Sequence, residues 1–154
     1  MTYYFLDSSA LVKRYVPESG TNWVRQITHP TGGHIILIAY VTPVEIISAL
    51  MRRKREGLID DRTAHALRLL LDHHVSHEYR VLDLTNQIIQ KAEDLLESYP
   101  LRAYDSIQLA SAWVSNARFA AVGLAPLSFI TSDMRLNSFA IAEGLAVDDP
   151  SDHA

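Results

Sequence analysis

Residues 35–45 read IILIAYVTPVE, and this stretch decides the fold class. Its first five residues are all apolar, which is typical of a strand buried on both faces of a parallel sheet. Thr42, Pro43 and Glu45 then have the pattern of a helix start: a threonine cap, a proline at the first helical position and a glutamate that completes a capping box. A buried strand that leads directly into a helix predicts one unit of a parallel α/β sheet.

The same succession of strand and helix recurs on both sides of this unit. We expect further strands at residues 3–6, 79–84 and 127–131, and a last edge strand at 146–147. The helical patterns lie at residues 10–15, 21–28, 43–57, around 67–71, 85–99, 103–117 and about 134–143. Gly144 is placed to end the last helix. The sequence therefore predicts an α/β fold, a three-layer α/β/α sandwich with a central, mainly parallel sheet.

Composition narrows the class of protein. A length of 154 residues fits one domain, which we expect to span residues 1–150, with a C-terminal tail at 151–154. The absence of cysteine excludes disulfides and cysteine-bound zinc. A net charge of −4 argues against a large basic face that coats duplex nucleic acid, but it leaves a carboxylate-based nuclease open. No signal peptide or membrane-length apolar run is visible, so a cytoplasmic location is expected and no membrane partner.

Four acidic residues occupy similar places in the expected fold. Asp7 follows the first strand, Glu45 lies in the first helical turn after the second, and Asp133 follows a later strand. Asp105 lies in the first turn of the helix that begins near residue 103. Because ligands of such sheets bind beyond the carboxyl ends of the strands, we expect several of these acids to share one cleft.

Each acid taken alone could be only a helix cap or dipole partner, worth about 0.3–1 kcal/mol. Together they would repel one another, by roughly 3 kcal/mol for two carboxylates about 5 Å apart at an effective dielectric constant near 20. A divalent cation would offset this repulsion, and Mg²⁺ accepts one or two carboxylates, water and phosphate as ligands. Such an ion suits phosphodiester hydrolysis. Ser9 and Thr131 could orient the carboxylates from behind, or serve only as turn and cap residues.

Four segments of the chain resemble the motifs of PIN-domain proteins of the VapC type. They are LDSSALVK at 6–13, TPVEI at 42–46, LRAYDSIQLA at 101–110 and FITSDMRL at 129–136. The resemblance runs from residue 3 to about residue 150. It implies that Asp7, Glu45, Asp105 and Asp133 bind Mg²⁺ or Mn²⁺. It also implies an endoribonuclease that is the toxin of a toxin–antitoxin pair, forms homodimers and is inhibited by a small antitoxin protein.

Other functions compete with this hypothesis. A phosphatase of the haloacid dehalogenase type also uses a strand-end aspartate, but it needs a second aspartate where Ser9 stands. A receiver domain needs an acid pair after the first strand and a phosphorylated aspartate in mid-chain, for which there is no good candidate. A non-catalytic PIN-like module that binds RNA or protein is the third alternative, and the presence of all four acids speaks against it.

Three further features receive a structural interpretation. The basic run at residues 52–55, Arg52, Arg53, Lys54 and Arg55, is typical of a solvated helix end, with a phosphate or acidic antitoxin contact as the alternative. The histidines at 73, 74 and 77 lack the spacing of a zinc site. The tryptophans and tyrosines are expected in packing and at a dimer face rather than in base stacking.

Overall fold

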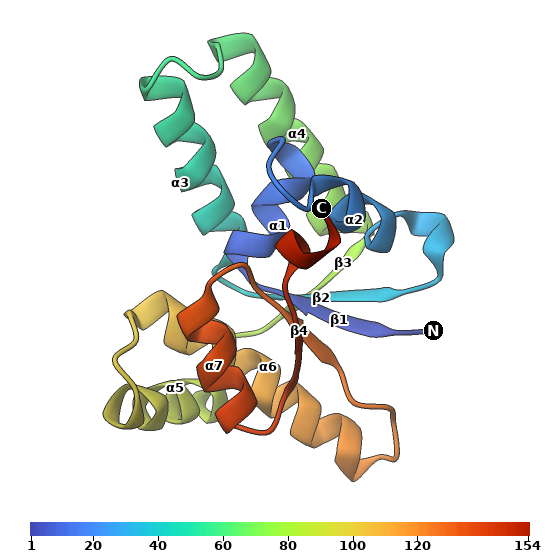
Figure 1. Cartoon of the computed structure of the whole chain (residues 1–154), viewed down its shortest axis with the longest axis vertical. Helices are drawn as coiled ribbons and strands as arrows, with labels where there is room; N and C mark the ends of the chain where they lie inside the picture. The colour runs from blue at the N-terminus through green and yellow to red at the C-terminus, as the bar shows by residue number, and fades with distance from the viewer.

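Five parallel strands form the centre of the fold in the computed structural model, which describes residues 1–154 (Figure 1). In sheet order they are β3 (Tyr79–Leu82), β2 (Ile35–Ala39), β1 (Tyr3–Leu6), β4 (Ser128–Ile130) and β5 (Ala146–Asp148). Every pair of neighbours is parallel. The prediction of a parallel sheet with a last edge strand near residue 146 is confirmed.

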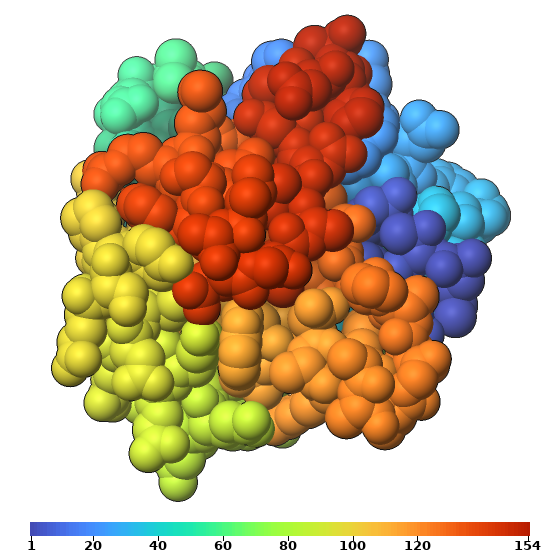
Figure 2. Space-filling model, turned by 60° about the horizontal axis from the view of Figure 1, so that its bottom comes forward, coloured from blue at the N-terminus to red at the C-terminus, as the bar shows by residue number.

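Seven α-helices cover the two faces of this sheet (Figure 1). On one face lie α1 (Ser8–Tyr15), α2 (Thr21–Ile27), α3 (Thr42–Arg55) and α4 (Asp61–His77). On the other lie α5 (Asn86–Ser98), α6 (Ala103–Ala121) and α7 (Met134–Ala142). Figure 2 shows this second layer from outside, with yellow α5 and red-orange α7 side by side. The predicted α/β/α sandwich is confirmed.

Alternation along the strands explains why both faces need a helical layer. Successive side chains of a strand point to opposite faces. Phe5 packs with Phe129 and the residues of α5, α6 and α7, whereas its neighbour Leu6 packs with Leu11 and the residues of α1 to α4. All four of these side chains are fully buried. An apolar residue is therefore required at every position of a central strand, and this is the pattern seen at 35–39.

Several boundaries differ from the sequence-based expectation. The helix around 67–71 extends over Asp61–His77, and the one expected to end at 117 continues to Ala121. Two short 3₁₀ helices, Pro30–Gly32 and Pro150–His153, were not expected. The second contains most of the expected tail and packs on α2. Gly20 is required there, because it has a φ of 88° and a Cβ atom would lie 2.3 Å from the carbonyl oxygen of Pro150.

The capping box expected at the start of α3 does not form. The N-cap is Val41 in a helical conformation, without a side-chain cap, and Thr42 is already inside the helix. The Thr42 hydroxyl instead contacts the amide of Gln108, which also donates to Glu45. Both residues of the expected box are therefore drawn into tertiary hydrogen bonds with α6, which replace the local ones.

No helix of the chain has both the length and the apolar composition needed to cross a lipid bilayer.

Candidate functional site

The four acids all stand at helix N-termini beside the carboxyl edge of the sheet. Asp7 is the N-cap of α1 and Asp133 is the N-cap of α7, and each accepts hydrogen bonds from backbone N–H groups of its helix. Glu45 and Asp105 lie in the first turns of α3 and α6. The positive end of a helix dipole favours an anion at each of these places. Helix capping and the helix dipole therefore explain part of the arrangement of the acids. Whether an acid can also bind a ligand depends on its burial and its hydrogen-bond partners.

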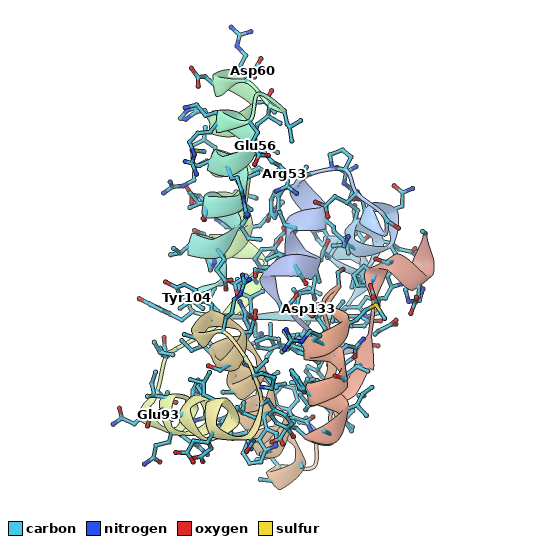
Figure 3. The ribbon with its side chains drawn as sticks, turned by 60° about the vertical axis from the view of Figure 1, so that its left-hand side comes forward. Arg53, Glu56, Asp60, Glu93, Tyr104 and Asp133 are labelled. Atoms are coloured by element: carbon cyan, nitrogen blue, oxygen red, sulfur yellow. The ribbon has the colours of Figure 1, made fainter.

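Three of the acids line one hollow of about 380 Å³, namely Glu45, Asp105 and Asp133. Figure 3 shows Asp133 in the band between the helices of the upper layer and those of the lower layer. Two cationic side chains, Arg102 and Arg135, line the same hollow. None of the three acids forms an ion pair, since every salt bridge of the chain joins other residues.

Asp7 lies below the surface, with 3% of its area exposed. Its Oδ1 accepts the Ser9 hydroxyl at 2.7 Å and the Ala10 N–H at 2.9 Å, and its Oδ2 accepts the Thr131 hydroxyl at 2.6 Å. A carboxylate offers about four acceptor positions, so one remains free on Oδ2. Burial raises the pKa of Asp7 to about 6, although the three hydrogen bonds oppose the rise. The charge of Asp105 adds a small further increase to this pKa, so the two carboxylates interact.

Ser9 and Thr131 connect Asp7 to the loop that carries Asp133. Ser9 Oγ accepts the N–H of Ser132 at 3.0 Å, and Thr131 Oγ1 accepts the N–H of Asp133 at 3.1 Å. The two hydroxyl oxygens lie 3.2 Å apart. Both side chains therefore fix the direction of the Asp7 carboxylate and the position of the β4–α7 loop at once, and this exceeds simple cap chemistry.

Glu45 is held by Ser8 and Gln108, two side chains that were not among the residues predicted for the site. Its Oε2 accepts the Ser8 hydroxyl at 3.0 Å, and its Oε1 accepts the Gln108 amide at 2.6 Å. Burial raises the pKa of Glu45, and these two hydrogen bonds oppose the rise. Gln108 follows Asp105 by three residues on α6, a spacing that places both on one face of the helix. That spacing was the available signal for Gln108.

Asp105 is the least constrained of the four acids, because its carboxylate has no hydrogen-bond or salt-bridge partner in the structure. Burial is the larger cause of its raised pKa, the charge of Asp133 is the second, and Arg102 opposes both. Repulsion between the acids was expected, and it contributes to the raised pKa values of Asp7, Glu45 and Asp105. Desolvation by burial is nevertheless the first cause at all three residues.

The donor atoms at this edge fit a hard divalent cation. They are carboxylate and hydroxyl oxygens, the ligand type of Mg²⁺ and Mn²⁺. The Ser132 hydroxyl is buried beside them without a hydrogen-bond partner. No three histidine, cysteine, aspartate or glutamate side chains stand in a ready-made metal cage anywhere in the chain, the histidines of α4 included. Mg²⁺ does not need one, because one or two carboxylates with waters and substrate phosphate suffice.

Comparisons with known proteins agree with this architecture. The PIN domain family model matches residues 4–141. The structure of VapBC2 from Rickettsia felis bound to a DNA fragment from their promoter is similar over 96% of this chain and 98% of that one, with 13% identity and a TM-score of 0.64. FitAcB from Neisseria gonorrhoeae is similar over 96% and 97%, with 14% identity and a TM-score of 0.64. A toxin–antitoxin complex from Klebsiella pneumoniae is similar over 96% of this chain and 97% of that one, with 16% identity and a TM-score of 0.62. No curated protein sequence matches the chain.

Proposed function

Because the chain belongs to the PIN domain family, we propose that it is a metal-dependent endoribonuclease and the toxin of a toxin–antitoxin pair. The observation that carries the proposal is the placement of the four acids. Asp7, Glu45, Asp105 and Asp133 stand at four helix N-termini on one edge of the sheet, and no cationic side chain is ion-paired with any of them. Uncompensated carboxylates of this kind favour a divalent cation as their partner.

The four acids are the proposed metal-binding residues, and Mg²⁺ or Mn²⁺ is the proposed ion. When bound, the ion would lower the pKa of a water molecule and stabilise the negative charge on the leaving oxygen. The chain contributes the orientation of the ligands. Ser9 and Thr131 direct Asp7, whereas Ser8 and Gln108 direct Glu45. Such supporting hydrogen bonds commonly change metal affinity or activity about 10- to 100-fold.

RNA is the proposed substrate. The hollow holds both acids and arginines, and Arg102 and Arg135 can attract the phosphates that the acids alone would repel. The strand-end phosphatase is disfavoured, because such an enzyme would use Asp7 as a nucleophile. This carboxylate is buried and already accepts three hydrogen bonds.

The proposed protein partners are a second copy of the chain and a small antitoxin. Support for the antitoxin comes from the similar structures, among which is a complex described as toxin–antitoxin. Expression of this chain alone should then arrest growth, and co-expression of a small protein encoded next to it should relieve the arrest. Undisturbed growth at strong expression of folded protein would contradict the toxin role.

The nuclease activity is tested with purified protein that has been treated with EDTA. We expect end-labelled RNA to stay intact until Mg²⁺ or Mn²⁺ is added, and we expect the Asp105→Asn variant to leave it intact throughout. Asp105 is suitable because its carboxylate has no hydrogen bond whose loss would disturb the fold. Equal cleavage with and without metal would overturn the proposal.

A further inference from the structure

We propose that the ring of Tyr104 stacks on an unpaired nucleobase of the substrate, and that a basic hollow next to this ring binds the adjacent phosphate. This inference rests on the proposed function and adds two substrate contacts to it: a base contact at Tyr104 and a phosphate contact in the basic hollow, both made by an unpaired RNA strand that crosses from the acidic hollow to the basic one. The tyrosines were expected in packing and at a dimer face, and Tyr104 does not fit the packing part of that expectation.

Tyr104 is exposed at the centre of the candidate site. It precedes Asp105 in the first turn of α6, and 54% of its area is accessible to solvent. Its hydroxyl has no hydrogen-bond partner, and its ring packs against no other aromatic ring. Figure 3 labels it at the boundary between α3 above and α6 below. An aromatic ring in such a place has a free face to offer to a ligand.

Tyr104 is also shared by two neighbouring hollows of the molecule. One is the acidic hollow of about 380 Å³ described above. The other, of about 520 Å³, lies between α1 and α3 and meets the first at Tyr104 and Glu45. A strand that passes from one hollow to the other must therefore pass the ring.

The second hollow has the charge of a phosphate site. Three cationic side chains line it, namely Lys13, Arg52 and Arg53, and two acids, Glu18 and Glu45, oppose them. Lys13 and Arg53 are both paired with Glu18. Arg52 is exposed and has no ion-pair partner, so its guanidinium is available to an anion. Arginine is well suited to phosphate because its planar donors match the phosphate oxygens.

These contacts divide the basic run at the end of α3. Arg52 and Arg53 line the hollow, whereas Lys54 pairs with Asp61 and Arg55 lies outside the lining. The run is therefore more than a solvated helix end, because half of it faces the candidate site. Arg55 supplies a matched control for Arg52, since both are exposed arginines of the same helix.

An unpaired base is required, because a tyrosine ring can stack only on a base that has left its duplex neighbours. Stacking on an aromatic side chain is tolerant of sequence, since every base has a flat face. The expected loss on removal of the ring corresponds to about 5- to 150-fold weaker binding. The inference thus predicts a preference for single strands over paired segments, with little discrimination among bases at the stacked position.

The test measures how tightly the protein binds a fluorescently labelled single-stranded RNA. Binding is followed by fluorescence anisotropy in a buffer that contains Ca²⁺, and a gel shows whether the RNA is still intact. Tyr104→Ala should weaken binding about 5- to 150-fold, whereas Tyr104→Phe, which keeps the ring, should bind within about twofold of the wild type. Tyr40→Ala is the matched control, because Tyr40 is 58% exposed and lines neither hollow. The same RNA in a blunt duplex should bind more weakly to the wild type.

Arg52 is tested through the salt dependence of binding. Arg52→Gln should lower the slope of log affinity against log salt by about 1, and Arg55→Gln should leave it unchanged. Unchanged affinity in Tyr104→Ala would overturn the stacking role. Equal losses in Tyr104→Ala and Tyr104→Phe would also overturn it. Cleavage that needs no metal contradicts the proposed function, whereas metal-dependent cleavage with Tyr104-independent binding contradicts this inference alone.

Discussion

Replacement of Asp7 by asparagine should stabilise the metal-free protein. The wild-type carboxylate is 3% exposed, and its burial raises the pKa from 3.8 to about 6. At neutral pH this rise corresponds to a cost of roughly 3 kcal/mol for keeping the buried group charged. Asparagine caps a helix about as well as aspartate and carries no charge. In the wild type, Asp7 Oδ2 accepts a hydrogen bond from the Thr131 hydroxyl, and the asparagine has only one oxygen to accept such bonds. The loss of this acceptor reduces the gain, so we expect the free energy of unfolding to rise by about 1–3 kcal/mol.

The gain should depend on pH in a defined direction. The folded protein holds a proton on Asp7 more tightly than the unfolded chain, so wild-type stability from this group is full below pH 3.8 and is lost as the pH rises through about 6. The variant has no such group. The difference in stability between Asp7→Asn and the wild type should therefore be largest above pH 6 and should vanish below pH 3.8.

The assay is thermal unfolding in EDTA between pH 3.5 and 8. For a chain of this size 1 kcal/mol shifts Tm by about 2–4 °C, so Asp7→Asn should melt about 2–12 °C higher at neutral pH. Asp60→Asn is the matched control, because Asp60 is the N-cap of α4 but is exposed, and its pKa is lowered by hydrogen bonds from Thr63. It should not be stabilised. A destabilised Asp7→Asn at neutral pH, or a gain that persists at pH 3.5, would refute the reasoning.

The remaining predictions concern the side chains around the acids and one buried histidine. Gln108→Met should lower the initial rate of RNA cleavage about 10- to 100-fold without unfolding the protein, because Glu45 loses the hydrogen bond from the Gln108 amide. An unchanged initial rate would show that this contact is only structural. Thr131→Val should cost about 1–3 kcal/mol in urea unfolding, since a buried donor to Asp7 is lost, and Thr131→Ser should restore most of it. Burial lowers the pKa of His74 to about 4, so its contribution to stability should be lost as the pH falls from about 6.5 to 4. An NMR titration of His74 with a midpoint near 6.5 would contradict that prediction.

Much of the fold was predictable because its signals are local. A strand covered on both faces must be apolar at every position, and residues 35–39 show this without any knowledge of their neighbours. The places of Asp7 and Asp133 were predictable for the same reason, since each directly follows a strand and caps a helix. Because the strands are parallel, residues that directly follow a strand lie at the same edge of the sheet, the edge formed by the carboxyl ends.

The partners of the acids were not predictable in the same way. The capping box at Thr42 and Glu45 obeys local rules, but both side chains bond to Gln108, which is 63 residues from Glu45 along the chain. The choice between the local capping box and the hydrogen bonds to Gln108 depends on how α3 packs near α6. The dominance of burial over repulsion at Asp7 and the exposure of Tyr104 also depend on packing. Residue types and spacing carry little information on either.

The most direct test of the central claim is the initial rate of RNA cleavage against Mn²⁺ concentration, for the wild type and one variant of each acid. The variants are Asp7→Asn, Glu45→Gln, Asp105→Asn and Asp133→Asn, with Asp94→Asn on the exposed side of α5 as the control. Each of the four should lower the rate by more than about 100-fold, the upper range for loss of a supporting partner. Asp94→Asn should cleave like the wild type, and the wild type should be inactive in EDTA. A full rate in EDTA, or in any of the four variants, would contradict the account.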